Sequence, residues 1–220
     1  DLATALPLAL ASDPISAFGS VVATNRRFDG NVSALLGDIF IECIAAPGFG
    51  DKTRNQIAKK KNCRLLEMPD VKFDPRQEFR SITAGVLLQD LDAAGPEVGE
   101  GGWHVMTERQ PDKDEWTSLR FAWNACKHVK SNAIVLVQGE ATVGIGGGQP
   151  NRIDCVRIAG ERAGKQAEGS VMASDAFFPF ADSVEHAATL GVTAIVQPGG
   201  SVRDQVCIDA ANAAGMAMVA

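Results

Sequence analysis

Residues 182–219 read DSVEHAATLGVTAIVQPGGSVRDQVCIDAANAAGMAMV and carry the clearest start and stop signals for helices and strands in the chain. Asp182 with Glu185 three residues later matches the capping-box pattern that opens a helix. Gly191 follows this helix, as glycine often does at a helix C-terminus, because it adopts the left-handed conformation at little cost. The apolar run 192–197 then predicts a strand.

The same order repeats toward the C-terminus. Pro198 and the two glycines after it predict a turn, and Ser201 with Asp204 forms a second, weaker capping box. Gly215 ends the helix that follows, and residues 216–219 form another apolar run. Helix, strand, helix and strand in this order are typical of an α/β layered fold.

A similar unit occurs in the first half of the chain. Residues 43–48 read CIAAPG, and residues 194–199 read AIVQPG. In both segments the proline lies 18 positions before the next apolar strand, which begins at Leu65 or at Met216. We therefore expect two similar α/β subdomains; the alternative is the general likeness of all strand–helix–strand units.

The composition changes between these two units. Acidic residues and glycines leave residues 89–111 with little apolar periodicity, which predicts a connector. The first subdomain is then expected over 1–88 and the second over 112–220. Within the second, 112–127 has helical spacing and 133–137 is a run typical of a buried strand.

Length and composition exclude several classes of protein. The 220 residues allow one large domain or two small ones, and 45% apolar with 22% charged residues is ordinary for a globular chain. No apolar stretch approaches the roughly 20 residues of a membrane span. Because 21 basic and 27 acidic residues give a net charge of −6, a broad nucleic-acid-binding face has no global support. We expect neither a membrane nor a nucleic acid as partner.

The cysteines and the standard motifs of enzyme sites are also informative. Five cysteines are widely spaced and never form C-x-x-C, which argues against a disulfide framework and a structural zinc site. A reducing cytoplasm is the simplest compartment. The sequence contains no P-loop, no zinc-deaminase signature and no G-x-S-x-G elbow. We predict no metal site from the residues.

Two segments place glycines and an arginine at the start of a predicted helix. The glycine-rich run 142–149 allows backbone amides to approach a bound group, and Asn151 can cap a helix that begins at Arg152. A phosphate or carboxylate ligand fits such a site. The alternative is a tight hairpin before a helix, with Arg152 solvated. Residues 198–204, with Arg203, repeat the pattern more weakly, and there the alternative is a stable N-terminal turn.

An aromatic segment precedes the helix predicted at Asp182. Phe177, Phe178 and Phe180 lie close in sequence to Asp175, and aromatic rings beside a carboxylate can stack a flat heterocycle. The alternative is that the three rings belong to the hydrophobic core or form a hydrophobic staple with the helix.

Five ordered motifs closely resemble AICAR transformylase, the folate-dependent formyltransferase of purine synthesis that is usually fused to IMP cyclohydrolase. They are DPISAFGS at 13–20, KHVKSNAIVL at 127–136, VGIGGGQPNRID at 143–154, SDAFFPFADSVEHAA at 174–188 and IVQPGGSVRD at 195–204. Because the motifs are long and distributed over nearly all 220 residues, a coincidence is remote.

The resemblance implies a fold, a reaction and an assembly. The fold is a three-layer α/β/α architecture, cytidine-deaminase-like but without the deaminase zinc, in two similar subdomains. In the reaction, the 5-amino group of AICAR (5-aminoimidazole-4-carboxamide ribonucleotide) takes the formyl group of 10-formyltetrahydrofolate to give FAICAR, on the route to IMP. The assembly is a cytoplasmic homodimer whose active sites use residues of both subunits.

The resemblance also implies roles for individual residues. Asn132 corresponds to an asparagine that assists transfer. The AICAR site would use Gly19, Glu42, Asn132, Arg152 and Phe178. Positions close to the folate co-substrate would be Ile153, Ser183, Val202 and Arg203. In some members of the family a monovalent cation lies near the aspartate that corresponds to Asp175.

The sequence also departs from the family pattern. The family's general base is a histidine preceded by a lysine, in a K-H-x-N-P-x-G segment upstream of DPISAFG; Lys127-His128 is a different pair. A closing R-x-F-x-H segment and the cyclohydrolase domain are not in these residues either, so we expect a chain incomplete at both ends. The leading hypothesis is part of the transformylase; the alternatives are a non-catalytic relative that binds nucleotide or folate, and an inactive fragment.

Overall fold

The computed structural model describes residues 1–60, 62–69, 77–92 and 102–220. Its residues form two compact units. The first consists of Asp1–Ala3 and Ser16–Gly95, and the second of Thr4–Ile15 and Pro96–Ala220. No described helix is long and apolar enough to cross a membrane.

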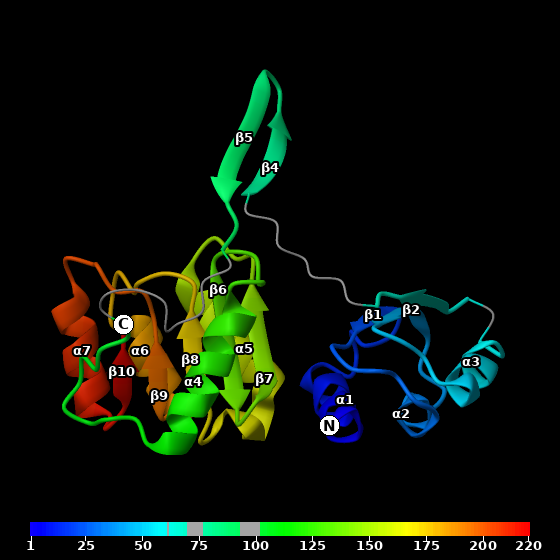
Figure 1. Ribbon diagram of the computed structural model, residues 1–220. Coiled ribbons are helices and arrows are strands. Elements are labelled where there is room, and N and C mark those ends of the chain that lie inside the picture. Colours follow the sequence, from blue (N-terminus) through cyan, green and yellow to red (C-terminus); the bar gives the residue numbers. More distant parts are fainter. Residues whose placement is uncertain (61, 70–76, 93–101) are drawn as a thin grey trace. The chain divides into compact units, whose positions relative to one another are not determined.

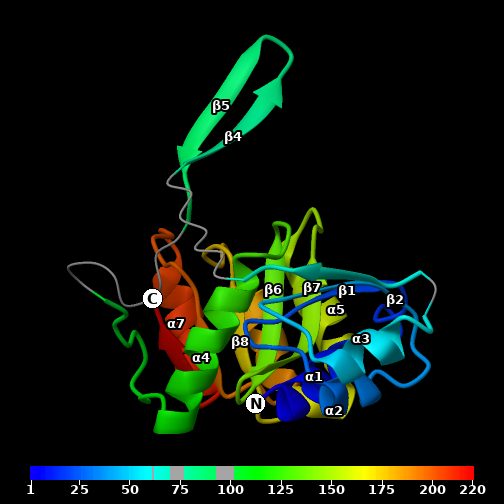
Figure 2. The same cartoon turned by 45° about the vertical axis from the view of Figure 1, so that its right-hand side comes forward.

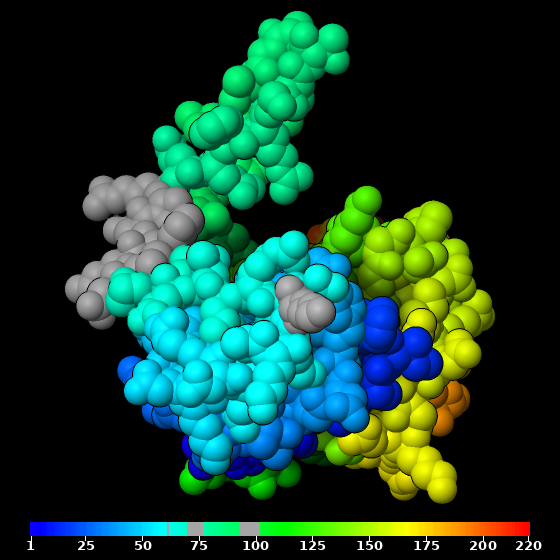
Figure 3. All heavy atoms as spheres, turned by 90° about the vertical axis from the view of Figure 1, so that its right-hand side faces the viewer, coloured from blue at the N-terminus to red at the C-terminus, as the bar shows by residue number. Residues whose placement is uncertain are grey.

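The first unit is built on a parallel sheet with strand order β1-β2-β3 (Figure 1). Its elements are β1 (Ser20–Ala23), α2 (Gly30–Ala34), β2 (Ile41–Ala46), α3 (Asp51–Ile57) and β3 (Arg64–Glu67). Ile44 of β2, Phe49 of the following turn and Ile57 of α3 are buried together with Phe28. The predicted strand, Pro-Gly turn, helix and strand are thereby confirmed. Figure 3 shows part of the surface of this unit as medium-blue to cyan atoms.

An antiparallel hairpin that the sequence patterns do not predict follows in the chain. β4 (Gln77–Ile82) pairs with β5 (Gly85–Asp90), with Ile82 opposite Gly85. The predicted connector 89–111 therefore begins inside β5. Most of its glycine-rich part, 93–101, lies outside the described residues.

The second unit contains a mixed five-stranded sheet with the order β10-β9-β8-β6-β7. Its strands are β6 (Ala133–Gln138), β7 (Ala141–Gly147), β8 (Val171–Ser174), β9 (Ala194–Val196) and β10 (Ala217–Val219). Its helices are α1 (Leu2–Ser12) from Thr4 onward, α4 (Lys113–Cys126), α5 (Arg152–Ala163), the short 3-10 helix η1 (Gly164–Ala167), α6 (Asp182–Thr189) and α7 (Asp204–Ala213). β8, β9 and β10 are parallel, whereas β6 runs antiparallel to both of its neighbours.

Helices cover both faces of this sheet, which gives the second unit three layers. Alternate residues of β6 point to opposite faces, as in any strand. Ile134 and Leu136 belong to a hydrophobic cluster with residues of α5, α6 and α7. Val135 and Val137 belong to another cluster with residues of α4, the helix that crosses in front of the sheet in Figure 2. The mixed α/β class that we expected is therefore confirmed.

The capping box predicted at Asp182 is wrong. Asp182 is the first residue of α6 rather than its cap, and the amide of Glu185 donates to the carbonyl of Ala181. The carboxylate of Asp182 instead accepts a hydrogen bond from the amide of Ser183. The pattern was misplaced because Asp182 and Glu185 both lie in the first helical turn, where acidic side chains are favoured by the helix dipole alone.

The second predicted capping box is present in part. The carboxylate of Asp204 accepts hydrogen bonds from the amides of Gly200 and Ser201, and the hydroxyl of Ser201 accepts from the amide of Arg203. The helix itself begins at Asp204. Gly215, with φ of 67°, follows the helix as predicted.

Candidate functional site

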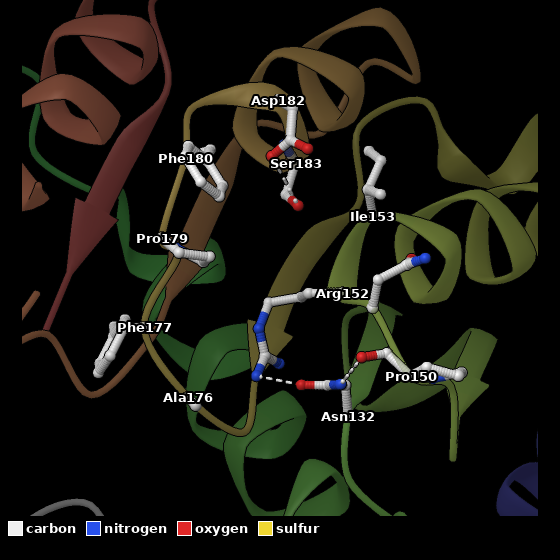
Figure 4. A pocket seen from close by; sticks show the side chains of 11 residues that line it. Asn132, Pro150, Arg152, Ile153, Ala176, Phe177, Pro179, Phe180, Asp182 and Ser183 are labelled. Carbon is white, nitrogen blue, oxygen red and sulfur yellow. Dashed lines mark hydrogen bonds between the residues drawn. The ribbon is translucent and has the colours of Figure 1, made fainter.

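A cavity of about 450 Å³ lies in the second unit, where the ends of several elements meet (Figure 4). The residues that line it come from four places: the residue before β6, the start of α5, the loop after β8 and the start of α6. They are Asn132, Pro150, Asn151, Arg152, Ile153, Ala176, Phe177, Pro179, Phe180, Asp182 and Ser183. Four of the predicted site residues are therefore brought together: Asn132, Arg152, Ile153 and Ser183.

The direction of the strands explains why these residues meet. β6 runs antiparallel to β8, with Ile134 opposite Ser174, so the residue before β6 lies beside the end of β8. Asn151 caps α5 by accepting a hydrogen bond of 2.9 Å from the amide of Asp154, which is the cap that the sequence predicted. The cap fixes the start of α5 and with it the first helical residue, Arg152.

The side chain of Arg152 is largely shielded from solvent and connects three other side chains. Its Nη1 atom donates to the hydroxyl of Ser174 at 3.0 Å and to the carboxylate of Asp175. Its Nη2 atom donates to Oδ1 of Asn132 at 2.7 Å. Only 9% of the Arg152 side chain is exposed, and 17% of the Asp175 side chain. The alternative interpretation, a solvated arginine, is wrong, because the side chain is shielded from water and is paired with Asp175, as a charged group in such a place requires.

The side-chain amide of Asn132 is held by hydrogen bonds at both ends. Its nitrogen donates to the carbonyl of Gln149 at 2.8 Å and to that of Pro150 at 3.2 Å. Its oxygen accepts from Arg152, and Figure 4 shows this contact and the one with Pro150. Both amide hydrogens are thereby used. A carboxamide oxygen has two lone pairs, so the oxygen can accept one further hydrogen bond. In this arrangement the side chain is ready to accept from a ligand rather than to donate to it.

Asp175 carries a stabilised negative charge next to this pair. Burial by itself raises the pKa of the carboxyl, but hydrogen bonds from the Ser131 side chain, the Ala133 amide and the Arg152 guanidinium outweigh it and lower the pKa below its usual range. The amide of Ala133 donates to Oδ1 at 2.9 Å. Asp175 is thus an ionised anchor for Arg152 at neutral pH.

The thiols nearby are not activated nucleophiles. The Sγ atom of Cys155 lies 3.1 Å from the carbonyl oxygen of Asn132, and burial raises the pKa of this thiol. Burial raises the pKa of Cys126 to about 12. A nucleophilic cysteine requires a lowered pKa and access to solvent, so covalent chemistry at these two sulfurs is not supported.

The three phenylalanines have different environments. Phe178 is fully buried in the core, and its carbonyl lies 3.5 Å from the sulfur of Cys207. Phe177 and Phe180 are 41% and 54% exposed and line the cavity. The core alternative is therefore confirmed for Phe178, and the aromatic wall is formed by its two neighbours. The role of Phe178 in the AICAR site stays a prediction.

Val202 and Arg203, the other two residues predicted to lie close to folate, do not line the cavity. The guanidinium of Arg203 stacks over the ring of Phe180, with 4.7 Å between its central carbon and the ring centroid. Val202 is fully exposed. Neither is among the described residues that line the cavity, so Arg203 is connected to it through Phe180.

Gly19 and Glu42 belong to the first unit, and the cavity is formed without them. Gly19 has φ of 76°, and its amide donates to the carbonyl of Phe40 at 2.8 Å, directly before β1. Glu42 is exposed on the neighbouring strand β2, where it follows Ile41, the residue that pairs with Ser20 of β1. Their part in an AICAR site stays a prediction.

Two glycines of the run 142–149 allow a strand to pack closely against a helix. A Cβ atom on Gly144 would lie 2.1 Å from the carbonyl oxygen of Ala159, and one on Gly146 would lie 2.0 Å from that of Cys155. These glycines let β7 pack closely against the backbone of α5. Close packing accounts for these two glycines, and an anion cradle formed by the backbone amides of the run stays a prediction.

Four of the lining residues were not predicted to belong to a ligand site: Pro150, Ala176, Pro179 and Asp182. Asp182 was interpreted as a helix cap, and the others flank predicted residues. Pro150 lies before α5 and the other three lie after β8, so the two segments are distant in the sequence and come together only in the folded chain. A usable signal was the closeness of each to a motif: Pro150 lies within GQPNR, and Ala176 and Pro179 lie within SDAFFPF.

Comparisons with known proteins agree with this arrangement of motifs. The family model described as AICARFT/IMPCHase bienzyme matches residues 1–162. The bifunctional purine biosynthesis protein PurH of Synechocystis sp. is 46% identical over 218 residues, which cover 99% of this chain and 42% of the relative. The proteins of the same name from Anoxybacillus flavithermus and Shouchella clausii are each 47% identical, over 220 and 208 residues.

The chain spans about two fifths of the length of these relatives: 42% of the Anoxybacillus protein and 40% of the Shouchella protein. The matches nevertheless cover 99% and 94% of the chain itself. The motifs that surround the cavity therefore belong to one continuous region of similarity. On this basis the 220 residues belong to the AICARFT/IMPCHase bienzyme family.

Proposed function

We propose that this chain forms part of a formyltransferase that moves the formyl group of 10-formyltetrahydrofolate to the 5-amino group of AICAR, giving FAICAR in purine biosynthesis. Membership of the family supports the reaction class. The observation that carries the proposal is the hydrogen bond between Arg152 and Asn132 at the edge of a cavity with an aromatic wall. Both residues lie in motifs that match the family, and Arg152 sets the orientation of the Asn132 carboxamide.

Asn132 has a specific task in this proposal. Its two amide hydrogens are used by carbonyls, and its oxygen keeps one free lone pair. We assign that lone pair to an N–H of the attacking amino group, which directs the lone pair of the amine nitrogen at the formyl carbon. A polar contact that is oriented before the reaction costs no reorganisation during it.

Formyl transfer exchanges one carbon–nitrogen bond for another and moves one proton. The amine nitrogen forms a bond to the formyl carbon, and the bond between that carbon and the folate nitrogen breaks. The amine loses one proton, and the tetrahydrofolate nitrogen gains one. In the family the proton acceptor is the histidine of the Lys-His pair, whose K-H-x-N-P-x-G motif does not occur in residues 1–220.

The cavity suits a flat heterocycle such as the pterin ring. Its volume of about 450 Å³ lies within the usual range of roughly 300 to 1,000 Å³ for ligand pockets. Phe177, Phe180 and Ile153 supply apolar surface, and Ser183 supplies a hydroxyl. In the proposal Ile153, Ser183, Val202 and Arg203 bind the folate, with Arg203 held over Phe180.

Gly19, Glu42 and Phe178 complete the AICAR site in this proposal. Arg152, anchored by Asp175, contributes a fixed positive charge to it.

We also propose that the protein is a cytoplasmic homodimer with shared sites. A monovalent cation near Asp175 is a further part of the proposal, although the groups that contact Oδ1, the Ala133 amide and the Arg152 guanidinium, are hydrogen donors and not cation ligands.

The two similar α/β units support the finer proposal of a cytidine-deaminase-like fold in two subdomains. In each unit a strand, a Pro-Gly turn and a helix lead to the next parallel strand. Cys43 of β2 pairs with Arg64 of β3, and Ala194 of β9 pairs with Ala217 of β10. The offset is 21 residues in the first unit and 23 in the second.

The full-length native polypeptide tests the proposal. With AICAR and 10-formyltetrahydrofolate we expect formation of tetrahydrofolate, followed by its absorbance, and of FAICAR, identified by mass. A correctly folded full-length protein without this activity would refute the formyltransferase assignment. Calorimetric titration with AICAR and a folate analogue then separates a non-catalytic binding relative, which gives heat with a ligand, from a protein that binds neither.

A further inference from the structure

We propose that Asp175 is a positioning residue for the transfer step, acting through Arg152 on the carboxamide of Asn132. The inference rests on the proposed function, because Asn132 is the residue assigned there to the reacting amine. Asp175 is not among the described residues that line the cavity. Its influence on a ligand must therefore pass through a neighbour.

Arg152 provides that connection, because one planar guanidinium contacts both residues. Its Nη1 atom is held by Asp175 and Ser174, and its Nη2 atom contacts Oδ1 of Asn132 at 2.7 Å. A guanidinium is rigid, so fixing Nη1 also fixes the direction of Nη2. The carboxylate therefore determines where Arg152 donates and, through that donation, which way the Asn132 amide faces.

Asp175 also holds the backbone next to Asn132. The same Oδ1 atom accepts a hydrogen bond of 2.9 Å from the amide of Ala133. One carboxylate oxygen thus holds both the side chain of Asn132, through Arg152, and the peptide that follows Asn132. The substitution Asp175→Asn keeps an amide oxygen for Ala133 but removes the charge that anchors Arg152, so it separates the two effects.

A double-mutant cycle in the full-length polypeptide tests the coupling. We expect Asp175→Asn to lower kcat by about tenfold to a hundredfold, with a smaller change in KM for AICAR, because a misplaced contact costs rate more than binding. In the Asn132→Ala background the same substitution should lower kcat by less than about twofold, since the group through which Asp175 acts is gone. Additive losses in kcat, or a change confined to KM, would overturn the proposal.

Asp154→Asn is the matched control. Asp154 lies two residues after Arg152 in α5, and its ion pair with Arg157 is exposed to solvent. We expect this variant to keep the kcat of the parent in both backgrounds. If Asp175→Asn does not fold, Asp175→Glu keeps the charge but displaces the guanidinium, and the same cycle applies to it.

A crystal structure of the Asp175→Asn variant gives a readout independent of activity. We expect the Asn132 amide to lose its contact with Arg152 and to turn away from the carbonyls of Gln149 and Pro150. An unchanged amide would overturn the positioning role. If the parent protein transfers no formyl group, the proposed function fails, and this structure still decides whether Asp175 orients Asn132.

Discussion

The Nη2 atom of Arg152 donates a hydrogen bond of 2.7 Å to Oδ1 of Asn132, so the first residue of α5 orients a side chain that precedes β6. The two residues are 20 positions apart in the sequence. Only 9% of the Arg152 side chain is exposed. This relationship separates the expected effects of substitution at the two positions.

Removing the Asn132 side chain should affect turnover more than binding. We expect Asn132→Ala in the full-length protein to lower kcat by about a hundredfold, because it removes an oriented polar contact to the reacting group. The affinity for AICAR should fall by much less. Steady-state kinetics and calorimetry measure the two quantities; equal losses in both would mean that Asn132 only positions the substrate.

Replacing Arg152 by lysine should weaken binding of AICAR. Lysine keeps the positive charge but cannot contact Asp175, Ser174 and Asn132 with one planar group. We expect the dissociation constant to rise by about tenfold, which corresponds to roughly 1.4 kcal/mol. Arg157→Lys, on the solvent-exposed side of the same helix, is the control and should leave the dissociation constant unchanged. An unaltered affinity for the Arg152 variant would argue against its role in binding.

The ionised carboxylate of Asp175 should make stability depend on pH. Because the pKa of Asp175 is lower in the folded chain than in the unfolded chain, its contribution is fully present above the ordinary aspartate pKa of about 3.9. The contribution is lost as the pH falls through the folded-state pKa. The difference in unfolding free energy between the parent and Asp175→Asn should therefore shrink below about pH 4. A difference that stays constant from pH 7 to pH 3, measured by denaturant unfolding, would contradict the ionised state.

The two neighbouring phenylalanines should respond differently to truncation. Phe178→Ala removes a fully buried ring and should cost about 3 to 5 kcal/mol of stability. Phe177→Ala removes an exposed ring of the cavity wall, so we expect a change of less than about 1 kcal/mol but weaker binding of a folate analogue. Chemical denaturation and calorimetry distinguish the two outcomes, and the reverse pattern would place Phe178 at the surface.

Gly146 should tolerate no side chain. A Cβ there would lie 2.0 Å from the carbonyl oxygen of Cys155, and because this oxygen belongs to the backbone of α5 it cannot move aside cheaply. We expect Gly146→Ala to lower the unfolding free energy by about 3 kcal/mol. Gly102→Ala, where a Cβ meets no atom within 4 Å, is the control and should change it by less than about 0.5 kcal/mol. Equal stability of both variants would exclude close packing as the reason for the glycine.

Predictions from local pattern were reliable for the main α/β elements. The strand over 133–137, the helix over 112–127 and the Asn151 cap are confirmed. The true capping box lies at Asp112 with Glu115, whereas the one predicted at Asp182 is wrong. Both carry the same acidic spacing, so only the backbone conformation before the helix distinguishes them.

The candidate site was predictable from motifs only in part. Asn132, Arg152, Ile153 and Ser183 were predicted and line one cavity. The sequence did not show which ring of the segment 177–180 faces the cavity, because the chain there is irregular and has no period that assigns a side chain to a face. The β4–β5 hairpin was missed for a related reason, since its two-residue turn, Thr83-Ala84, contains no glycine, proline, asparagine or aspartate.

The sequence by itself determined the family motifs, the α/β order of elements and the residues that carry the chemistry of the proposal. These features are local, because they follow from residue type and spacing along the chain. Only the tertiary structure decided that Asp175, Arg152 and Asn132 form one hydrogen-bonded unit. That unit depends on β6 running antiparallel to β8, which brings the start of one strand to the end of the other and lets the first turn of α5 reach both.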